Sequence, residues 1–222
     1  MKNNKAFIPY KGVTYSKEEM IKRSKEFYEY MDKRRSLRMF SDREIPIEVI
    51  ENIIKTASSA PSGAHKQPWT FCVVSNPAIK KEIRKAAEAE EYLSYNGRMT
   101  KEWLADLAVF NTDWHKEFLE TVPYLIVVFK KSYDLINAQK HKNYYVNESV
   151  GLATGFLIAA IHQAGLVTLT HTPSPMIFLQ KILKRPENEK PFLLLPIGFP
   201  TDGAEVPDLK RKPLEEIMVL FE

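Results

Sequence analysis

The sequence predicts a single layered domain of the α/β or α+β class. Short apolar runs such as WTFCVV, YLIVVF and FLLLPIGF have the length and the β-branched and aromatic content expected of strands. They are separated by longer segments in which apolar residues recur at three- and four-residue steps, as in amphipathic helices. Because the two kinds of segment alternate along the 222 residues, helices should pack on the faces of a sheet.

Periodicity and start and stop residues place the helices. One helix is predicted to begin near Pro46, which suits a first turn, with Ser41 and Asp42 before it as candidate caps. The apolar face of that helix is marked by Ile50, Ile53, Ile54 and Ala57. The other predicted helices cover residues 17–33, 76–95, 99–121, 145–164 and 174–183.

Four segments are predicted to be strands, residues 69–75, 124–129, 166–170 and 192–199. The run YLIVVF has no polar alternation, which is typical of a strand buried on both faces. Before the first strand, SSAPSGAHKQPW contains Pro61, Gly63 and Pro68 and predicts a tight irregular loop. The apolar tail, residues 213–221, has no partner in its own neighbourhood, so we expect it to reach another subunit.

Composition limits the class of protein. The 32 basic and 28 acidic residues are too balanced for a nucleic-acid binder. The single cysteine, Cys72, excludes an intramolecular disulfide framework and favours a reducing, cytoplasmic setting. The N-terminus lacks the apolar core of a secretory leader, and the longest apolar stretch is interrupted by His162 and Gln163. We therefore expect a protein without a membrane or nucleic-acid partner.

No common catalytic fingerprint is present. The five histidines show no pair at metal-ligand spacing, so no metal site is predicted. The sequence contains no G-x-S-x-G elbow, P-loop or G-x-G-x-x-G motif. A nucleotide-like cofactor would therefore have to be bound by side chains.

Two basic clusters are candidates for such binding. In an extended segment, alternate residues such as Arg34, Ser36 and Arg38 face the same way and can line one wall. Arginine is suited to bidentate recognition of phosphate. A second cluster, LKRKPL, lies far along the chain. Taken alone, each cluster is either a solvated patch or part of a phosphate site.

Taken together, a set of ordered motifs resembles the nitroreductase-like FMN flavoproteins and, within them, the iodotyrosine deiodinases. The matching segments are RRSLRMFSDREIP, TASSAPSGAHKQPWTF, EEYLSYNGRM, TDWHKEFLETVPYLIVVFK, AGLVTLTHTP and VPDLKRKPLEEIM. The resemblance implies a central mixed sheet flanked by helices, with a subunit-swapped C-terminal extension. It also implies one domain over residues 1–222, with an N-terminal helix at about 16–33, a lid at about 88–117 and a C-terminal arm at about 207–222.

The resemblance implies FMN as the cofactor. Contacts to it are expected from Arg34, Arg35, Ser36, Leu37, Arg38, Ser62, Gly63, Thr170, His171, Thr172 and Arg211. Ser62 and Gly63 would serve the site of the partner subunit. Thr172 would be the catalytic residue that donates a hydrogen bond to flavin N5 and favours one-electron steps, with Thr170 as the alternative donor. A second alternative is that Thr172 only caps the following helix.

A zwitterionic substrate needs an anion for its ammonium and a cation for its carboxylate. Glu91 and Tyr95 are four residues apart and share a helix face. By the resemblance, Glu91 binds the ammonium, Tyr95 and Lys116 bind the carboxylate, and the backbone N–H of Ala64 binds the phenolate oxygen. The alternative for Glu91 is a plain solvated helix face.

The implied function is FMN-dependent reductive dehalogenation of mono- and diiodotyrosine, and of bromo- and chlorotyrosine, by single-electron steps. A homodimer with shared active sites and an electron donor, NAD(P)H directly or through a reductase, are expected with it. The rivals are a general NAD(P)H-dependent nitroreductase or flavin reductase, and a non-catalytic protein that binds flavin or an aromatic amino acid.

Overall fold

The computed structural model describes residues 7–222, so the first six residues of the expected leaderless N-terminus lie outside it. The chain divides into two compact units, residues up to Arg34 and Arg35–Glu222. The first unit contains α1 (Lys17–Asp32), which confirms the predicted helix. Ser16 caps it by accepting a hydrogen bond from the Glu19 N–H at 3.2 Å.

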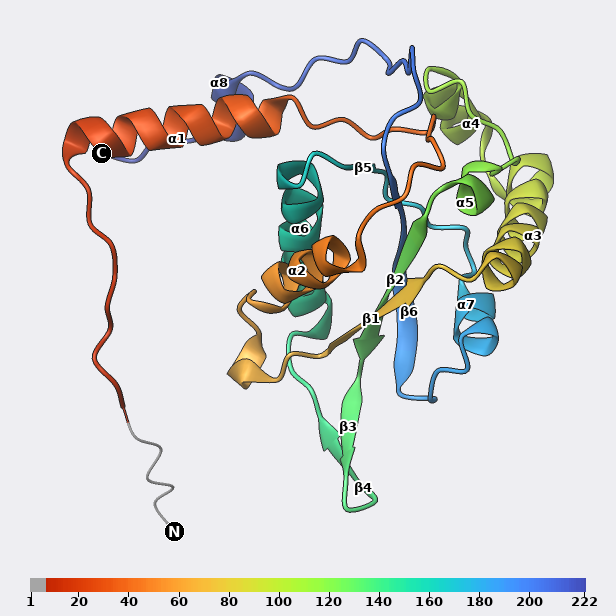
Figure 1. Ribbon diagram of the computed structural model, residues 1–222, viewed down its shortest axis with the longest axis horizontal. Coiled ribbons are helices and arrows are strands. Elements are labelled where there is room, and N and C mark those ends of the chain that lie inside the picture. The colour runs from red at the N-terminus through yellow and green to blue at the C-terminus, as the bar shows by residue number, and fades with distance from the viewer. Residues whose placement is uncertain (1–6) are drawn as a thin grey trace. The chain divides into compact units, whose positions relative to one another are not determined.

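A sheet forms the centre of the second unit (Figure 1). Its four strands lie in the order β1 (Trp69–Val74), β2 (Tyr124–Lys131), β6 (Glu189–Gly198) and β5 (Val167–Thr168). Neighbouring strands pair antiparallel, and a parallel bridge between Ser36 and Thr168 gives the sheet its mixed character. The strands follow the predicted apolar runs.

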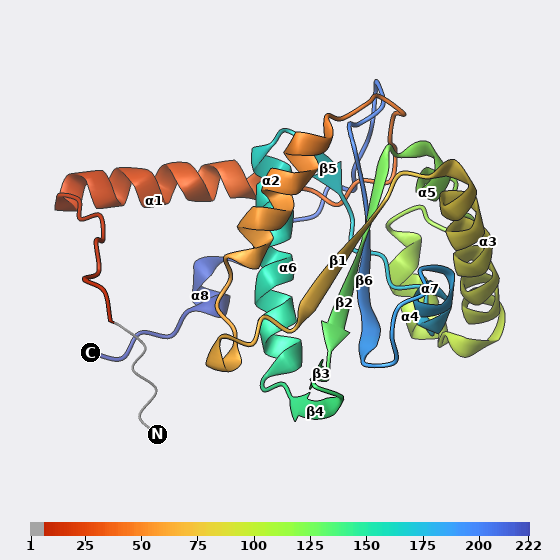
Figure 2. The ribbon, with the colours of Figure 1, turned by 60° about the horizontal axis from the view of Figure 1, so that its bottom comes forward.

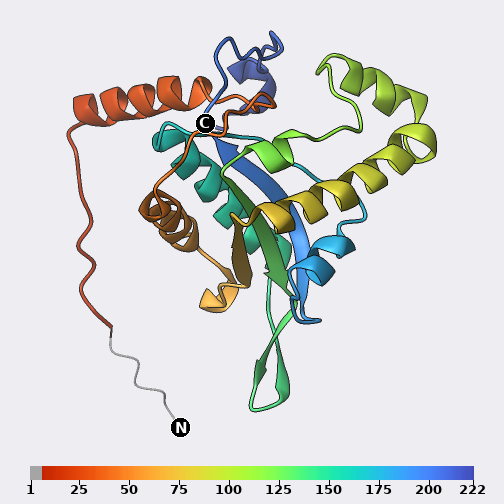
Figure 3. The same ribbon diagram turned by 45° about the vertical axis from the view of Figure 1, so that its right-hand side comes forward.

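Helices cover both faces of the sheet (Figures 2 and 3). One face carries α2 (Ile47–Ser58) and α6 (Val146–Gln163), and the other carries α3 (Pro77–Leu93), α5 (Phe118–Thr121) and α7 (Ile177–Ile182). β2 therefore lies between two apolar layers, and its residues from Leu125 to Phe129 have no exposed surface. The unbroken run YLIVVF predicted this burial on both faces.

The predicted helix over residues 99–121 is wrong. The chain forms η2 (Ser94–Arg98), α4 (Lys101–Ala108) and α5, and residues 109–117 contain neither helix nor strand. Asn111 has a left-handed φ of 44°, and the following Thr112 and Asp113 are residue types that favour turns over helix interiors. The break interrupts the three- and four-residue periodicity that predicted one continuous helix.

Two local predictions also need correction. The N-cap of α2 is Pro46, without a side-chain cap, so Ser41 and Asp42 do not cap it. The structure also contains an unpredicted hairpin, β3 (Tyr133–Ile136) and β4 (Gln139–Lys142). Its turn residues, Asn137 and Ala138, have φ values of 49° and 62°, the signs required by a type I′ turn. Alanine is uncommon there, which explains why the sequence signal was weak.

The C-terminal arm contains α8 (Leu214–Ile217) and exposes large apolar side chains. Ile217, Val219 and Phe221 are 67%, 78% and 90% exposed. The subunit-swapped role of this arm stays a prediction. Among the described residues, no helix combines the length and the apolar character needed to cross a bilayer.

Replacing Lys80 by Met should destabilise the fold by ~2–4 kcal/mol. Lys80 is only 7% exposed, and its ammonium donates to the carbonyl oxygens of Glu120 and Val122 at 2.9 and 2.6 Å, where α5 ends. Methionine fills similar space but leaves both oxygens without their donor. The check is urea denaturation beside Lys81→Met, at the exposed neighbouring position. Equal midpoints for the two variants would contradict the prediction.

Candidate active site

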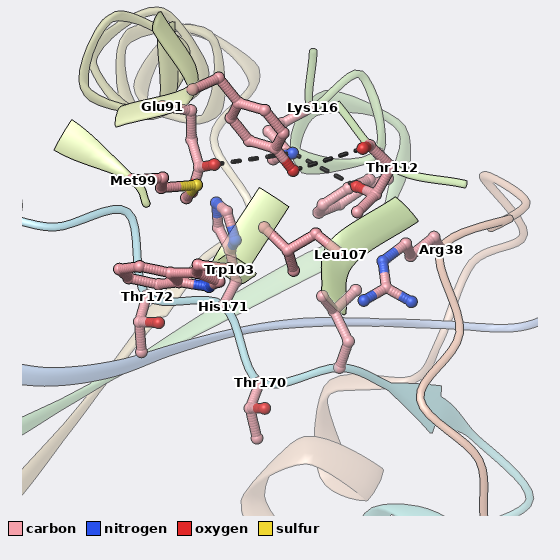
Figure 4. A pocket seen from close by; sticks show the side chains of 13 residues that line it. Arg38, Glu91, Met99, Trp103, Leu107, Thr112, Lys116, Thr170, His171 and Thr172 are labelled. Carbon is pink, nitrogen blue, oxygen red and sulfur yellow. Dashed lines mark hydrogen bonds and ion pairs between the residues drawn. The ribbon is translucent and has the colours of Figure 1, made fainter. Parts of the chain in front are cut away.

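A pocket of about 200 Å³ lies between the end of α3, the η2–α4 segment and the strand-like segment that follows β5 (Figure 4). Its lining combines charged, aromatic and hydroxyl side chains from distant parts of the sequence. They are Arg38, Glu91, Tyr95, Met99, Trp103, Leu107, Thr112, Lys116, Phe118, Leu169, Thr170, His171 and Thr172.

The structure brings the three predicted zwitterion ligands together at this pocket. The ammonium of Lys116 lies 3.9 Å from a carboxylate oxygen of Glu91, and the two side chains are only 5% and 12% exposed. Lys116 also lies 5.6 Å from the centre of the Tyr95 ring, whose hydroxyl donates to the Thr112 carbonyl at 3.3 Å. Figure 4 shows Glu91 and Lys116 pointing toward each other. The interpretation of Glu91 as a plain solvated residue is therefore wrong.

The surroundings oppose the charges of this pair. Burial raises the pKa of the Glu91 carboxyl, and the positive charge of Lys116 partly offsets this by lowering the same pKa. Burial lowers the pKa of Lys116, against the attraction of Glu91 and Asp113. Two partly desolvated charges that stabilise each other are typical of a site that binds a charged ligand.

The segment with Thr170, His171 and Thr172 forms the floor of the pocket. Two backbone hydrogen bonds with Leu194 anchor His171. Its N–H donates to the Leu194 carbonyl at 2.9 Å, and its carbonyl accepts from the Leu194 N–H at 3.1 Å. Its imidazole is buried, and burial lowers its pKa to about 3, helped by the nearby Lys116 and Arg38. The ring is therefore neutral. The threonines on either side of His171 are exposed and line the pocket.

Thr172 does not cap a helix. The next helix, α7, begins at Ile177, with Met176 as its N-cap and no side-chain cap. The capping alternative for Thr172 is wrong, and its hydroxyl is left at the pocket.

The first basic cluster is extended as predicted. Leu37 donates its backbone N–H to the Thr168 carbonyl at 3.2 Å and is buried. Ser36 and Arg38, on either side of it, border a second hollow of about 310 Å³. Arg38 lines both hollows, with its guanidinium 5.2 Å from the Phe110 ring, and Arg35 donates to the Pro207 carbonyl.

The other predicted flavin ligands do not line the first pocket. Arg34 belongs to the first unit, and Arg211 is exposed in the C-terminal arm. Ser62, Gly63 and Ala64 lie on the loop before β1, where Gly63 donates its N–H to the Ser149 hydroxyl of α6 at 3.2 Å. Their assignment to the site of a partner subunit stays a prediction.

The Ser62–Ala64 loop has an unusual backbone. Ala64 and His65, within η1 (Gly63–His65), have left-handed φ values of 51° and 56°. A Cβ on Gly63 would lie 2.9 Å from the Tyr144 carbonyl oxygen, so only glycine fits. Residues held in such conformations cluster at ligand-binding sites, which makes this loop a second candidate element.

The segment predicted to be a lid, residues 88–117, contacts the floor of the pocket through Arg98 of η2. Its guanidinium donates to a Glu90 carboxylate oxygen at 2.7 Å and to the Ser174 carbonyl at 3.2 Å. This contact joins the end of α3 to the segment that carries Thr172. These two hydrogen bonds tie the segment over the pocket to the pocket floor.

Comparison with known proteins identifies the family. The nitroreductase family model matches residues 31–199. The chain is 66% identical to an iodotyrosine deiodinase of Haliscomenobacter hydrossis over the full length of both chains. It is 50% identical to human iodotyrosine deiodinase 1, over 97% of this chain and 75% of the human one. The chain belongs to the iodotyrosine deiodinases of the nitroreductase family.

A solved structure gives the same result. An iodotyrosine deiodinase crystallised in its oxidised form with FMN and 3-iodo-L-tyrosine superposes with a TM-score of 0.76 at 30% identity, covering 88% of this chain and 98% of that one. An FMN-bound nitroreductase of Bacteroides fragilis shares the fold, with a TM-score of 0.67 at 19% identity. Both the predicted family and the nitroreductase-like fold are confirmed.

Sequence reasoning missed the apolar wall of this deiodinase pocket. Met99, Trp103 and Leu107 recur at four-residue steps within the predicted helix over residues 99–121. They line the pocket, and Trp103 is 53% exposed. The polar residues from Asn111 to Asp113 that end this periodicity were the available signal that the segment is a cover and not a core helix.

Proposed function

We propose that this protein removes halide from halotyrosines by FMN-dependent reduction, with mono- and diiodotyrosine as substrates and bromo- and chlorotyrosine accepted in the same pocket. The observation that carries the proposal is the buried Glu91–Lys116 pair beside Tyr95, at a pocket whose floor presents two threonine hydroxyls. An anion and a cation together match an α-amino acid, and the aromatic and apolar lining matches a phenol ring.

The residues present fit FMN. Arg35, Ser36 and Arg38 supply guanidinium and hydroxyl donors along one extended segment next to β5, and this donor set suits a phosphate and a polar ring edge. Arg34, Leu37 and Arg211 are proposed to complete it from this chain. FMN supplies a ring that can pass electrons one or two at a time.

The chain's own residues bind and orient the substrate. Glu91 receives the substrate ammonium, while Lys116 and Tyr95 receive its carboxylate, so the ion pair of the free protein is replaced by contacts to the ligand. The Ala64 N–H of the partner subunit donates a hydrogen bond to the phenolate oxygen, which suits a halogen-acidified phenol. Closure of residues 88–117 then excludes water from these contacts, which strengthens them.

Two features of the assembly belong to the proposal. The subunits form a homodimer, in which the exposed apolar arm and the strained Ser62–Ala64 loop reach the neighbouring subunit. The reducing equivalents come from NAD(P)H, directly or through a reductase, in the cytoplasm.

The decisive experiment is to load the purified protein with FMN, reduce it, add 3-iodotyrosine and measure iodide and tyrosine. Stoichiometric release of both is expected. A nitroreductase or flavin reductase would oxidise NAD(P)H with a nitroaromatic but release no iodide. A binding protein would quench flavin fluorescence with iodotyrosine and release none. A protein that stays colourless with added FMN would contradict the whole proposal.

Replacing Thr172 by Ala should lower iodide release about tenfold and raise the ratio of nitroaromatic reduction to iodide release by more. The hydroxyl is proposed to donate a hydrogen bond to flavin N5 and thereby favour one-electron steps. Without this hydroxyl, two-electron reduction of the nitroaromatic should become faster relative to iodide release. The measurement is the rate of iodide release and the rate of nitroaromatic reduction, both determined on one enzyme batch. Thr170→Ala is the matched control, because its hydroxyl lies two residues away on the same exposed side. A larger effect at Thr170 would assign the donor to that residue.

A further inference from the structure

A second carboxylate on α3, Glu88, lies one turn before Glu91. Its Oε1 accepts a hydrogen bond from the backbone N–H of Lys116 at 2.7 Å, and the side chain is 16% exposed. Residues three apart share a helix face, so Glu88 and Glu91 reach the same neighbouring segment. One helix therefore holds Lys116 at two points, at its backbone through Glu88 and at its ammonium through Glu91, 3.9 Å away.

The segment that carries Lys116 needs such a restraint. Residues 109–117 contain neither helix nor strand. Within its own segment the Lys116 ammonium contacts the Asp113 carbonyl and, at 3.5 Å, the Thr112 hydroxyl, and it also lies 5.6 Å from the centre of the Tyr95 ring of η2. The two contacts within the segment move with it and do not fix its position along α3. The Glu88 hydrogen bond does, because it joins the segment to a regular helix.

Arg84 holds Glu88 in place. Its Nε donates to the same Oε1 at 2.8 Å, and its other nitrogens lie 3.4 and 3.3 Å from the carboxylates of Glu117 and Glu120. The hydrogen bond with Glu88 raises the pKa of Arg84. An oxygen with two donors, one of them charged, is best served by an ionised carboxylate in a fixed rotamer. The network spans α3 and the residues on either side of the start of α5.

We propose that Glu88 is a positioning residue for the amino-acid site. It holds the Lys116 backbone in register with Glu91, so that the cation and the anion are spaced for one α-amino acid, and it does this without touching the ligand. The inference rests on the proposed function, since it takes Glu91 and Lys116 as the ligands of the zwitterion. Its consequence is selectivity for amino-acid phenols over phenols without those charges.

The test uses the FMN-loaded protein and two ligands, 3-iodotyrosine and 2-iodophenol, with flavin fluorescence quenching as the readout. Glu88→Ala should raise the Kd for iodotyrosine roughly 10- to 100-fold. Glu88→Gln should raise it less, because an amide oxygen still accepts the Lys116 N–H. The Kd for iodophenol and the FMN content should stay within about twofold. In turnover, KM for iodotyrosine should rise more than kcat falls.

Matched variants on the same helix separate positioning from general loosening. Glu82→Gln, at an exposed position of α3, should change neither Kd. Arg84→Met should reproduce part of the Glu88→Ala effect, because it frees the Glu88 rotamer. If Glu88→Ala does not fold, Glu88→Gln and Arg84→Met carry the test.

The outcomes are distinguishable. An unchanged iodotyrosine Kd in Glu88→Ala, or equal losses for both ligands, would overturn the inference while the proposed function stands. If the wild-type protein itself fails to bind iodotyrosine, the proposed function fails. Glu88 is then judged by hydrogen exchange at the Lys116 amide, which should accelerate in Glu88→Ala and stay unchanged in Glu82→Gln. Equal exchange in both would overturn its restraining role as well.

Discussion

Replacing Glu91 by Gln should weaken 3-iodotyrosine binding roughly 10- to 100-fold, because a hydrogen bond between opposite charges is worth about 1.5–3 kcal/mol when water is excluded. The Glu91 carboxylate is 12% exposed and is held 3.9 Å from Lys116 in the free protein. Glutamine keeps the shape but offers no charge to the substrate ammonium. The measurement is quenching of flavin fluorescence by iodotyrosine, with FMN affinity determined in parallel.

In the protein without ligand, the same substitution should change the pKa of Lys116. The Lys116 ammonium loses the attraction of Glu91, which opposes the effect of burial, so the pKa of Lys116 should be lower in Glu91→Gln than in the wild-type protein. A deaminated iodotyrosine analogue, which has no ammonium, is the matched ligand control and should bind both proteins equally. Equal iodotyrosine affinity in wild type and Glu91→Gln would remove this residue from the site.

The sequence predicted the sheet most directly at β2, which is buried on both faces. The residues of β2 from Leu125 to Phe129 have no exposed surface, and such a strand leaves a short unbroken apolar run in the sequence. The proposed zwitterion ligands, Glu91, Tyr95 and Lys116, follow from the sequence only through resemblance to a family. Nothing in the spacing of Glu91 and Lys116, on either side of α4, states that they meet.

The pocket-lining residues of the proposed lid and the proposed positioning residue Glu88 were less predictable for physical reasons. An apolar residue on a cover over a pocket and one on a core helix have the same periodicity, so Trp103 gave no separate signal. Glu88 was hidden among the charges of EAEEYL, because a carboxylate that accepts a backbone N–H from Lys116 looks like any helix-surface glutamate in sequence. Such roles depend on long-range packing and not on local pattern.

The unfolding free energy of the wild-type protein should fall by about 2–3 kcal/mol between pH 7.5 and 4.5 through His171 alone. Burial and the cations Lys116 and Arg38 hold its folded pKa at about 3, below the ordinary 6.5. Between these values the unfolded chain binds a proton that the folded protein does not. This stabilisation is therefore complete above pH 6.5 and is lost as the pH falls toward 3.

Because carboxylates also titrate in this range, the test compares pH slopes between variants. His171→Phe removes the titration and keeps an aromatic ring against Phe118, whose centre lies 5.9 Å from the imidazole. The Nε2 atom has no hydrogen-bond partner among the described residues, so the replacement leaves no donor or acceptor unpaired on its account. Urea denaturation at each pH should show that the unfolding free energy of His171→Phe depends less steeply on pH than that of the wild-type protein. His141→Phe, at an exposed position of β4, should keep the wild-type pH dependence. Parallel profiles for all three proteins would mean that His171 takes up its proton in the folded state as readily as in the unfolded one, and that the floor of the pocket is open to water.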